Sequence, residues 1–293
     1  MSDLSLSPPE GFVKTPGPMA RMVAKFMRDR LAVAALVILA LIVLLAVFAP
    51  WIAQNPEEGS ALRRLKPIGT EGHILGTDEI GRDMWARLVW GGRISLFAGL
   101  APVAIAVAIG GALGMVAGYV GGRVNAVIMR TMDVLFAFPS ILLAIAICAV
   151  IGPGLLSTIL AMATVFTPAI VRITETVTTR VRNMDYIEAA RATGIGHCHI
   201  LIAQVLPNIV GTVLVYAASL ASLSIVLAAG LSFLGLGLPP PTAEWGQMLN
   251  ALRQAIYVDP LLSIQPGVMI FVTSVCFNLV SDGVRGAMDV RAD

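Results

Sequence analysis

The sequence predicts an all-α integral membrane protein whose core is a bundle of six transmembrane helices. Of its 293 residues, 57% are hydrophobic and only 13% are charged, which is typical of membrane proteins and not of soluble domains. Apolar runs of about 20 residues, the length needed to cross a bilayer, recur along the chain. The polar stretches between these runs are too short to fold separately, so a single membrane domain is expected.

Residues 1–30 are expected to form a cytoplasmic tail that ends in an amphipathic helix. The first 18 residues are rich in Ser, Pro and Gly, and no removable signal peptide is expected there. Met22, Val23 and Phe26 then share one helical face, with basic residues among the other positions, a pattern that favours binding to the cytoplasmic lipid surface. A charged flank of the first span explains the same residues equally well.

Residues 31–52 form the first predicted span, and an extracytoplasmic segment, residues 53–93, follows it. Pro50 and Trp51 mark the outer end of this span, since aromatic rings favour the membrane interface. A helical apolar stripe within residues 80–89 predicts a short helix that lies against the outer face of the bundle.

The outer segment also contains interleaved acidic and basic side chains: Asp78, Glu79, Arg82, Asp83 and Arg87. The three acids alone would resemble a metal site. Because two arginines accompany them, a solvated or salt-bridged surface is the favoured interpretation.

Residues 94–281 are predicted to contain the other five spans, and residues 282–293 a cytoplasmic tail. The spans are expected at residues 94–119, 134–151, 155–173, 208–238 and 261–280, with a short inside loop at residues 121–133. The fifth run is too long for one straight span, so we expect that helix to be tilted or broken.

Small and hydroxyl-bearing residues stand out inside these spans. Glycines recur every four residues, at Gly110, Gly114, Gly118 and Gly122. Such a ridge lets another helix approach closely. Ser219 and Ser222 either line a polar path or bond carbonyls one turn back in their own helix, and the sequence favours neither. Thr164, in the fourth span, is a further candidate for lining the path.

A polar, helix-forming segment, residues 174–207, separates the fourth and fifth spans. Asp185 and Glu188 have the N-cap and N3 spacing of a capping box, and Gly194 is placed to end the helix in a left-handed conformation. A second apolar turn then runs up to Pro207, which a helix interior does not tolerate. On this local chemistry alone, a helical hairpin with no partner explains the segment as well as a docking loop does.

The order of residues in this segment resembles the signature loop of permease subunits from ATP-driven (ABC) importers. The resemblance rests on Glu188, Ala189, Ala190, Gly194, Leu206 and Pro207. Gln204 stands where an aliphatic residue is usual. In that family the loop is the cytoplasmic coupling helix, which docks into a groove on the ATPase subunit.

Further motifs resemble the C-type permeases of dipeptide and oligopeptide importers. They are Gly76-Thr77-Asp78, Gly81-Arg82-Asp83, the run from Gly92 to Leu96, Glu244-Trp245-Gly246, and the C-terminal run from Ser281 to Asp289. In the last of these, Ser281 and Gly286 stand where Gly and Asp are commoner. The motifs extend over nearly the whole chain, so the resemblance implies the six-helix bundle of the type I ABC importer permease class.

The resemblance implies that the chain is the permease of a di- or oligopeptide importer in the bacterial cytoplasmic (inner) membrane. Its implied partners are a homologous second permease, two cytoplasmic ATPase subunits, an extracytoplasmic peptide-binding protein and membrane lipid, without nucleic acid. ATP and Mg would bind to the ATPase subunits, and no cofactor is expected in this chain. Importers of nickel, glutathione or modified dipeptides share the motifs and are alternatives.

The distribution of basic residues orients the chain independently of this resemblance. Most of the 20 Lys and Arg residues fall on segments expected inside, among them Arg21, Arg123, Arg180 and Arg285. Because basic loops stay in the cytoplasm, both termini are expected to be cytoplasmic.

Other classes of function lack the residues that they need. The sequence contains no Gly-x-x-x-x-Gly-Lys-Ser/Thr run for ATP phosphates, and no nucleophile–base pair predicts catalysis. His197-Cys198-His199 mimics a metal site, but successive helical side chains point about 100° apart, so no metal site is predicted. An ion-coupled secondary transporter would need ionisable groups within its spans, whereas Asp133 and Asp282 lie only at span ends.

Overall fold

The computed structural model describes residues 18–288, with side chains from Ala20 onward. The regular structure of these residues is helical, with no strand among them. The predicted tail of residues 1–17 and the end of the predicted C-terminal tail, residues 289–293, lie outside the described part of the chain.

Within residues 18–288, five helices are long and apolar enough to cross a membrane. They are α2 (Arg30–Val47), α4 (Met84–Val120), α7 (Leu155–Arg182), the continuous helical run His197–Phe233 and α12 (Pro260–Met288). A sixth span forms if α5 (Gly122–Phe136) and α6 (Ser140–Ile151), which are bent by 88° relative to each other, are counted together. The predicted all-α membrane bundle is therefore confirmed for the described residues.

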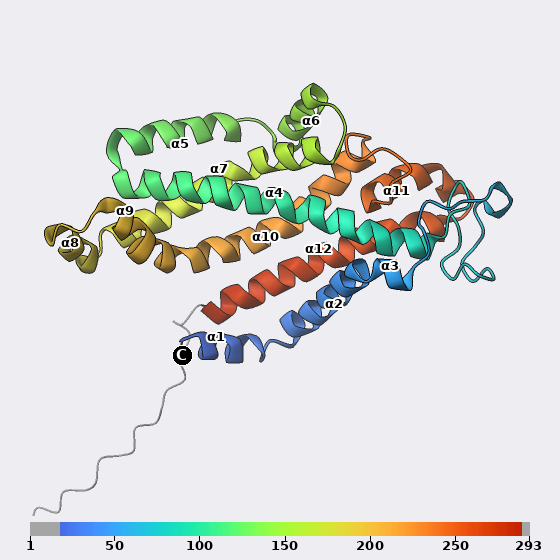
Figure 1. The fold of residues 1–293 in the computed structure, drawn as a ribbon, viewed down its shortest axis with the longest axis horizontal. Coiled ribbons are helices and arrows are strands. Elements are labelled where there is room, and N and C mark those ends of the chain that lie inside the picture. Colours follow the sequence, from blue (N-terminus) through green and yellow to red (C-terminus); the bar gives the residue numbers. More distant parts are fainter. Residues whose placement is uncertain (1–17, 289–293) are drawn as a thin grey trace, which may run out of the picture.

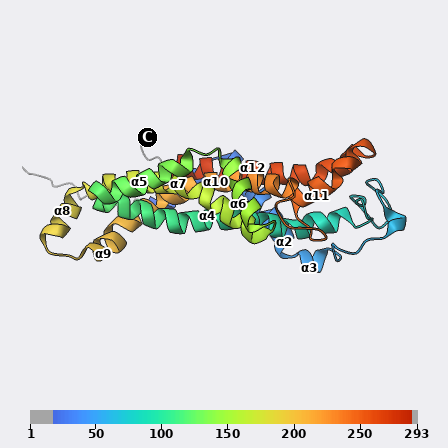
Figure 2. The same ribbon diagram turned by 90° about the horizontal axis from the view of Figure 1, so that it is seen from above.

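The long helices run side by side in an elongated bundle that is thin in one direction (Figures 1 and 2). α4 packs extensively on α7, α10 (Leu206–Phe233) contacts both α4 and α12, and α2 lies along α12. α8 (Asp185–Ala192) and α9 (His197–His199) project from one end, and residues 53–83 with α11 (Trp245–Ala251) cover the other (Figure 1). The predicted docking segment and the predicted outer segment thus lie at opposite ends of the bundle.

The first span has a defined start and packs against the last one. Asp29 caps α2, because its Oδ1 accepts hydrogen bonds from the backbone N–H groups of Leu31 and Ala32, at 3.0 and 3.1 Å. The preceding helix, α1 (Pro18–Phe26), contacts α12, where Gly283 leaves room for the Phe26 ring. A short helix, α3 (Ala49–Ile52), continues the first span to its outer end.

The second span begins ten residues earlier than expected, at Met84. Asp83 caps it, since its Oδ2 accepts a hydrogen bond from the backbone N–H of Ala86 at 2.8 Å. The short outer helix predicted within residues 80–89 is therefore not a separate element but mostly the start of α4. Gly91 and Gly92 leave room for the Trp245 indole, which lies 3.2 and 3.1 Å from where their Cβ atoms would stand.

The third predicted span, residues 134–151, is also corrected. The expected inside loop, residues 121–133, is mostly part of helix α5, and the chain bends by 88° before α6. Pro139 explains the break, because proline lacks an N–H and disfavours the helical conformation of the residue before it. The 12 residues of α6 are too few to cross a bilayer alone.

Three of the four ridge glycines lie where α4 meets α7. A Cβ atom on Gly110, Gly114 or Gly118 would stand only 2.6 to 2.9 Å from a backbone oxygen of α7, so no side chain fits there. Gly122 does not share this contact: it has a φ of +53° and no neighbour within 4 Å of its Cβ position. The ridge ends because α4 ends at Gly121, where the chain turns into α5.

Gly114→Leu is expected to destabilise the protein by about 1–3 kcal/mol, the usual cost of overpacking. Its Cβ would stand 2.6 Å from the Val171 carbonyl oxygen and 2.7 Å from the Thr174 Cβ. The midpoint of thermal unfolding in detergent measures the effect. Gly111→Leu is the matched control on the same helix, because a Cβ there meets nothing within 4 Å. Equal losses in the two variants would contradict this role of the ridge.

Candidate functional site

The first nine residues of the predicted polar segment, residues 174–182, form the end of α7, so the part that leaves the bundle begins with α8. Met184 is the N-cap residue and no side chain caps the helix, so the predicted capping box of Asp185 and Glu188 is wrong. Both acids lie instead in the first helical turn and are exposed. The positive end of the helix dipole stabilises carboxylates there. Because Glu188 is exposed, its carboxylate is available to another protein.

α8 ends in a defined C-terminal turn at Gly194, which has a φ of +79°. The backbone N–H of Gly194 bonds to the Arg191 carbonyl at 3.0 Å, and that of Ile195 bonds to the Ala190 carbonyl at 3.3 Å. These two bonds are those of a Schellman motif. Nothing lies within 4 Å of a Cβ placed on Gly194, so the backbone conformation and not crowding favours glycine at this position.

One face of α8 is anchored to the bundle. Ile187 and Ala190 pack against Ile200 and Val205 of the following helix and against Tyr119, the penultimate residue of α4. Ile187 and Ile200 are both fully buried. Since the cluster also includes a residue from the end of α7, a displacement of α8 would act directly on two of the spans.

The six residues of the signature loop divide into an exposed group and a buried one. Ala190 is 7% exposed and belongs to the anchoring cluster. The others are exposed: Glu188, Ala189, Gly194, Leu206 and Pro207. The chain therefore offers the Glu188–Ala189 side of α8 to a partner, while Ala190 supports it from below.

Pro207 does not end a helix, contrary to the prediction. A π-helical stretch, η2 (Ile200–Val205), joins α9 to α10, so the helical run continues through the proline. Pro207 lies in the first turn of α10, where a missing N–H costs least. Asn208 Nδ2 donates to the Gln204 carbonyl at 2.6 Å and to Tyr186 Oη at 3.2 Å, which links the start of α10 to α8.

Tyr119 connects α4 to the polar segment, a contact that the sequence did not predict. Its hydroxyl lies 2.9 Å from His197 Nδ1, and the Arg191 guanidinium carbon lies 4.9 Å from the centre of its ring. Its carbonyl accepts a hydrogen bond from Arg182 Nη1 at 3.4 Å. The only signal in the sequence was an aromatic residue at the end of an apolar run, which membrane-interface preference alone also explains.

The predicted path-lining hydroxyls make contacts within this chain. Ser219 Oγ lies 2.7 Å from Ser281 Oγ, and Ser222 Oγ lies 2.9 Å from Ser274 Oγ. These pairs join α10 to α12. Thr164 is half-buried on α7, where its hydroxyl donates to the carbonyl of Leu160, one turn back, at 2.8 Å.

The interleaved charges of the outer segment form a buried ionic cluster. Asp78, Arg82 and Arg87 are each 1% exposed. Asp78 Oδ2 accepts from Arg82 Nε at 2.5 Å and from Arg87 Nη1 at 2.7 Å, so the salt-bridged interpretation is right and the solvated one is not. Within residues 18–288, no group of three or more His, Cys, Asp or Glu side chains has a geometry suited to a metal ion.

A second set of contacts joins this cluster to residues 244–247, which are distant from it in the sequence. Arg87 Nη2 donates to Gln247 Oε1 of α11 at 3.1 Å. Glu244 caps α11 through hydrogen bonds from the N–H groups of Gly246 and Gln247, at 2.9 and 2.8 Å. Trp245 is fully buried and its Nε1 donates to the Leu88 carbonyl at 2.9 Å. The outer segment, α4 and α11 therefore form one packed cap.

A helical membrane bundle with a polar helix–turn–helix at one end and a packed cap at the other is the arrangement expected of a transport permease. Two family models agree with this class. One, for binding-protein-dependent transport system inner membrane components, matches residues 110–293, and one for the N-terminal transmembrane domain of oligopeptide transport permease C matches residues 17–67. The chain belongs to the family of binding-protein-dependent transport system inner membrane components, the permease subunits of ABC importers.

Relatives similar over most of their length carry related names. The chain is 40% identical to a di/tripeptide transport system permease protein of Pseudomonas aeruginosa, over 94% of this chain and 93% of the relative. It is 41% identical to a glutathione transport system permease protein of Escherichia coli O157:H7, over 91% of this chain and 88% of the relative. A putative peptide transport system permease protein of Brucella abortus is 37% identical, over 94% of this chain and 92% of the relative.

A solved structure shares the fold. An inward-facing form of the MetNI methionine ABC transporter matches with a TM-score of 0.56 and 17% identity, over 69% of this chain and 96% of that chain. The protein is thus a multi-pass membrane permease of an ABC importer, with the type I fold, and it acts together with other components of that importer.

Proposed function

We propose that this permease serves an importer of short peptides. Relatives of nearly equal identity are named for di- and tripeptides and for glutathione, itself a tripeptide, so a short peptide is the substrate chemistry that both share. The motifs of the outer cap support the same assignment, since Gly76-Thr77-Asp78 and Glu244-Trp245-Gly246 lie in or beside the buried network. Neither identity nor cap geometry favours nickel.

We assign the partners to the two ends of the bundle. We place the α8 end in the cytoplasm of a bacterial inner membrane, with both termini on that side. Two ATPase subunits dock there and hold ATP and Mg, while this chain supplies neither a catalytic residue nor a cofactor site. A homologous second permease completes the path, and a peptide-binding protein delivers substrate at the outer cap.

The observation that carries the coupling role is the two-sided character of α8. Glu188 and Ala189 are exposed, whereas Ile187 on the opposite face is buried against Tyr119 and the end of α7. When ATP closes the ATPase pair, α8 moves with its docking groove and displaces α4 and α7. Coupling of this kind biases a bundle that has two stable states, inward- and outward-facing.

Fewer hydroxyl groups are free to line the transport path than the sequence led us to expect. Ser219 and Ser222 bond to α12, and we assign them to the contact between α10 and α12 as well as to the rim of the path. Thr164, which is half-buried on α7 and bonds, among the described residues, only to the Leu160 carbonyl of its own helix, is the remaining candidate for a hydroxyl that faces the second permease or the substrate.

Co-purification and uptake test the proposed function together. The tagged chain is isolated from detergent-solubilised membranes, and we expect an ATPase and a second permease to accompany it. Reconstituted with them and with the binding protein, it should take up a labelled dipeptide or glutathione only when ATP is present. A chain that is isolated alone and transports under an ion gradient would overturn the proposal.

Tyr119→Phe is expected to lower the amount of substrate transported per ATP hydrolysed by about 2- to 10-fold. The change removes the hydroxyl that bonds His197 and keeps the ring, and one hydrogen bond contributes about 0.5–1.5 kcal/mol. Uptake and ATP hydrolysis are measured on the same reconstituted importer. Tyr216→Phe is the control, because no hydrogen bond of that hydroxyl is found within residues 18–288. An unchanged ratio in Tyr119→Phe would show that this contact does not transmit the motion.

A further inference from the structure

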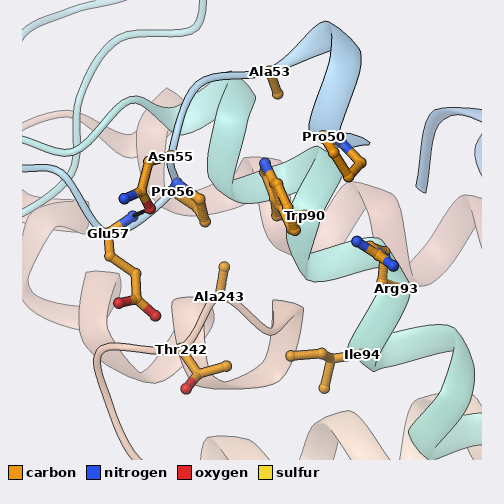
Figure 3. A pocket seen from close by; sticks show the side chains of 10 residues that line it. All are labelled: Pro50, Ala53, Asn55, Pro56, Glu57, Trp90, Arg93, Ile94, Thr242 and Ala243. Atoms are coloured by element: carbon orange, nitrogen blue, oxygen red, sulfur yellow. Dashed lines mark hydrogen bonds between the residues drawn. The ribbon is translucent and has the colours of Figure 1, made fainter. Parts of the chain in front are cut away.

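A cavity of about 630 Å³ opens at the outer end of the bundle. Three segments far apart in the sequence enclose it: the end of the first span with the loop after it, the first half of α4, and the loop before α11 (Figure 3). Most of its lining is apolar, from Pro50, Ala53, Pro56, Ile94 and Ala243. It is separate from the polar segment at the opposite end and from the buried ionic cluster.

The cavity lies at the level where the membrane ends. Arg93 lines it, and no charged residue follows Arg93 before the end of α4. Residues 31–52 of the first span also lack charge, and Trp51 at their outer end is 76% exposed. Aromatic and basic side chains occupy this position at membrane–water interfaces. A molecule in this cavity would therefore sit among lipid headgroups.

Two opposite charges face each other across this cavity, and neither has an ion-pair partner among the described residues. Glu57 lies at one side and Arg93 at the other, with Trp90 between them (Figure 3). The Arg93 guanidinium carbon lies 5.3 Å from the centre of the Trp90 ring, and Trp90 Nε1 donates to the Gln54 carbonyl at 3.1 Å. The ring thus positions the cation and fastens the Glu57 loop to α4.

From this arrangement we infer that the cavity binds the headgroup of an ethanolamine phospholipid from the outer leaflet. Arg93 binds the phosphate, which guanidinium groups recognise well. Glu57 accepts hydrogen bonds from the ammonium group. Phe48 precedes the lining residue Pro50 by two positions, and Phe97 follows Arg93 by one turn of α4. The two side chains are 48% and 56% exposed, and they provide an apolar surface for the acyl chains.

The charges of Glu57 and Arg93 also predict which headgroups bind poorly. A choline headgroup carries no N–H to donate to the Glu57 carboxylate. A glycerol headgroup has no cation at all, and its net negative charge is repelled by Glu57. A free peptide is also a zwitterion, but its backbone carries no acyl chain to cover the apolar surface at Phe48 and Phe97.

Native mass spectrometry of the full chain, alone and in the assembled importer, tests the inference. Phosphatidylethanolamine, phosphatidylcholine and phosphatidylglycerol with identical acyl chains are titrated separately. We expect about tenfold tighter binding of the ethanolamine lipid, the difference that corresponds to about 1.4 kcal/mol. Arg93→Gln should weaken binding of all three lipids, whereas Glu57→Gln should abolish only the preference for ethanolamine.

Matched controls and a competitor make the outcomes distinct. Arg253→Gln and Glu58→Gln change exposed charges that do not line the cavity, and they should bind like the unaltered chain. Equal affinity for the three lipids, or equal losses in the control variants, would overturn the inference. Displacement of the lipid by alanyl-alanine, lost in Arg93→Gln, would instead make the cavity a peptide subsite and also overturn it.

Discussion

Asp78→Ala is expected to destabilise the protein by about 3–5 kcal/mol, the cost of leaving buried charges without their partner. One carboxylate serves both Arg82 and Arg87, and all three side chains are 1% exposed. Asp78 Oδ1 also accepts from the backbone N–H groups of Ile80 and Arg82, at 3.0 and 2.9 Å. Its removal therefore takes away the centre of the outer cap, and the midpoint of thermal unfolding in detergent should fall markedly.

Two further variants separate this effect from a general sensitivity of the outer segment. Glu71→Ala removes an exposed acid from the same segment and should leave the midpoint unchanged. Arg87→Met removes one of the two cations, so Asp78 keeps Arg82, and the loss should be smaller than in Asp78→Ala. If Glu71→Ala were as destabilising as Asp78→Ala, the buried cluster would not be the cause.

Glu188→Lys is expected to abolish transport and to release the ATPase subunits, while the chain still inserts and keeps its second permease. The side chain is exposed in the first turn of α8, so the fold does not depend on it, and the substitution reverses the charge of the proposed docking surface. Rim and interface charges of this kind control the rate and specificity of association. Co-purification and ATP-driven uptake are the two measurements.

Asp185→Lys is the matched control for Glu188→Lys. Both acids lie in the first turn of α8, so both changes weaken the favourable interaction with the helix dipole by a similar amount. Only Glu188 belongs to the signature loop, and Asp185→Lys should retain uptake. Equal loss in both variants would assign the effect to the stability of α8 and not to docking.

The proposed coupling role of α8 and the inferred lipid site lie at opposite ends of the bundle, so each can be disproved without the other. Loss of ATPase binding in Glu188→Lys says nothing about the cavity at Arg93, and a lipid titration says nothing about α8. The outer cap connects with the cavity, since the loop before α11 contributes Thr242 and Ala243 to its lining. A lipid bound there would brace the first span against the cap.

The membrane architecture was predictable from the sequence because its cause is local. Backbone polar groups cannot stay unsatisfied in lipid, so an apolar run of sufficient length must be a helix. The glycine spacing of Gly110 to Gly118 likewise predicted a close helix contact, and Gly194 predicted a left-handed turn. These features depend on a residue's own chemistry and on neighbours within a few positions, which a sequence displays directly.

Only the tertiary structure decided what lies between and beneath those helices. Gly91 and Gly92 make room for Trp245 from a distant part of the chain, and α11 covers Arg87, the partner of Asp78, through Gln247. Tyr119 likewise bonds to His197. Each of these contacts joins residues that are distant in the chain. Burial and partnership are set by long-range packing. The sequence therefore determined the helical membrane class and the residues of the signature loop, whereas the folded chain determined the break before α6, the cap, the anchor of α8 and the cavity.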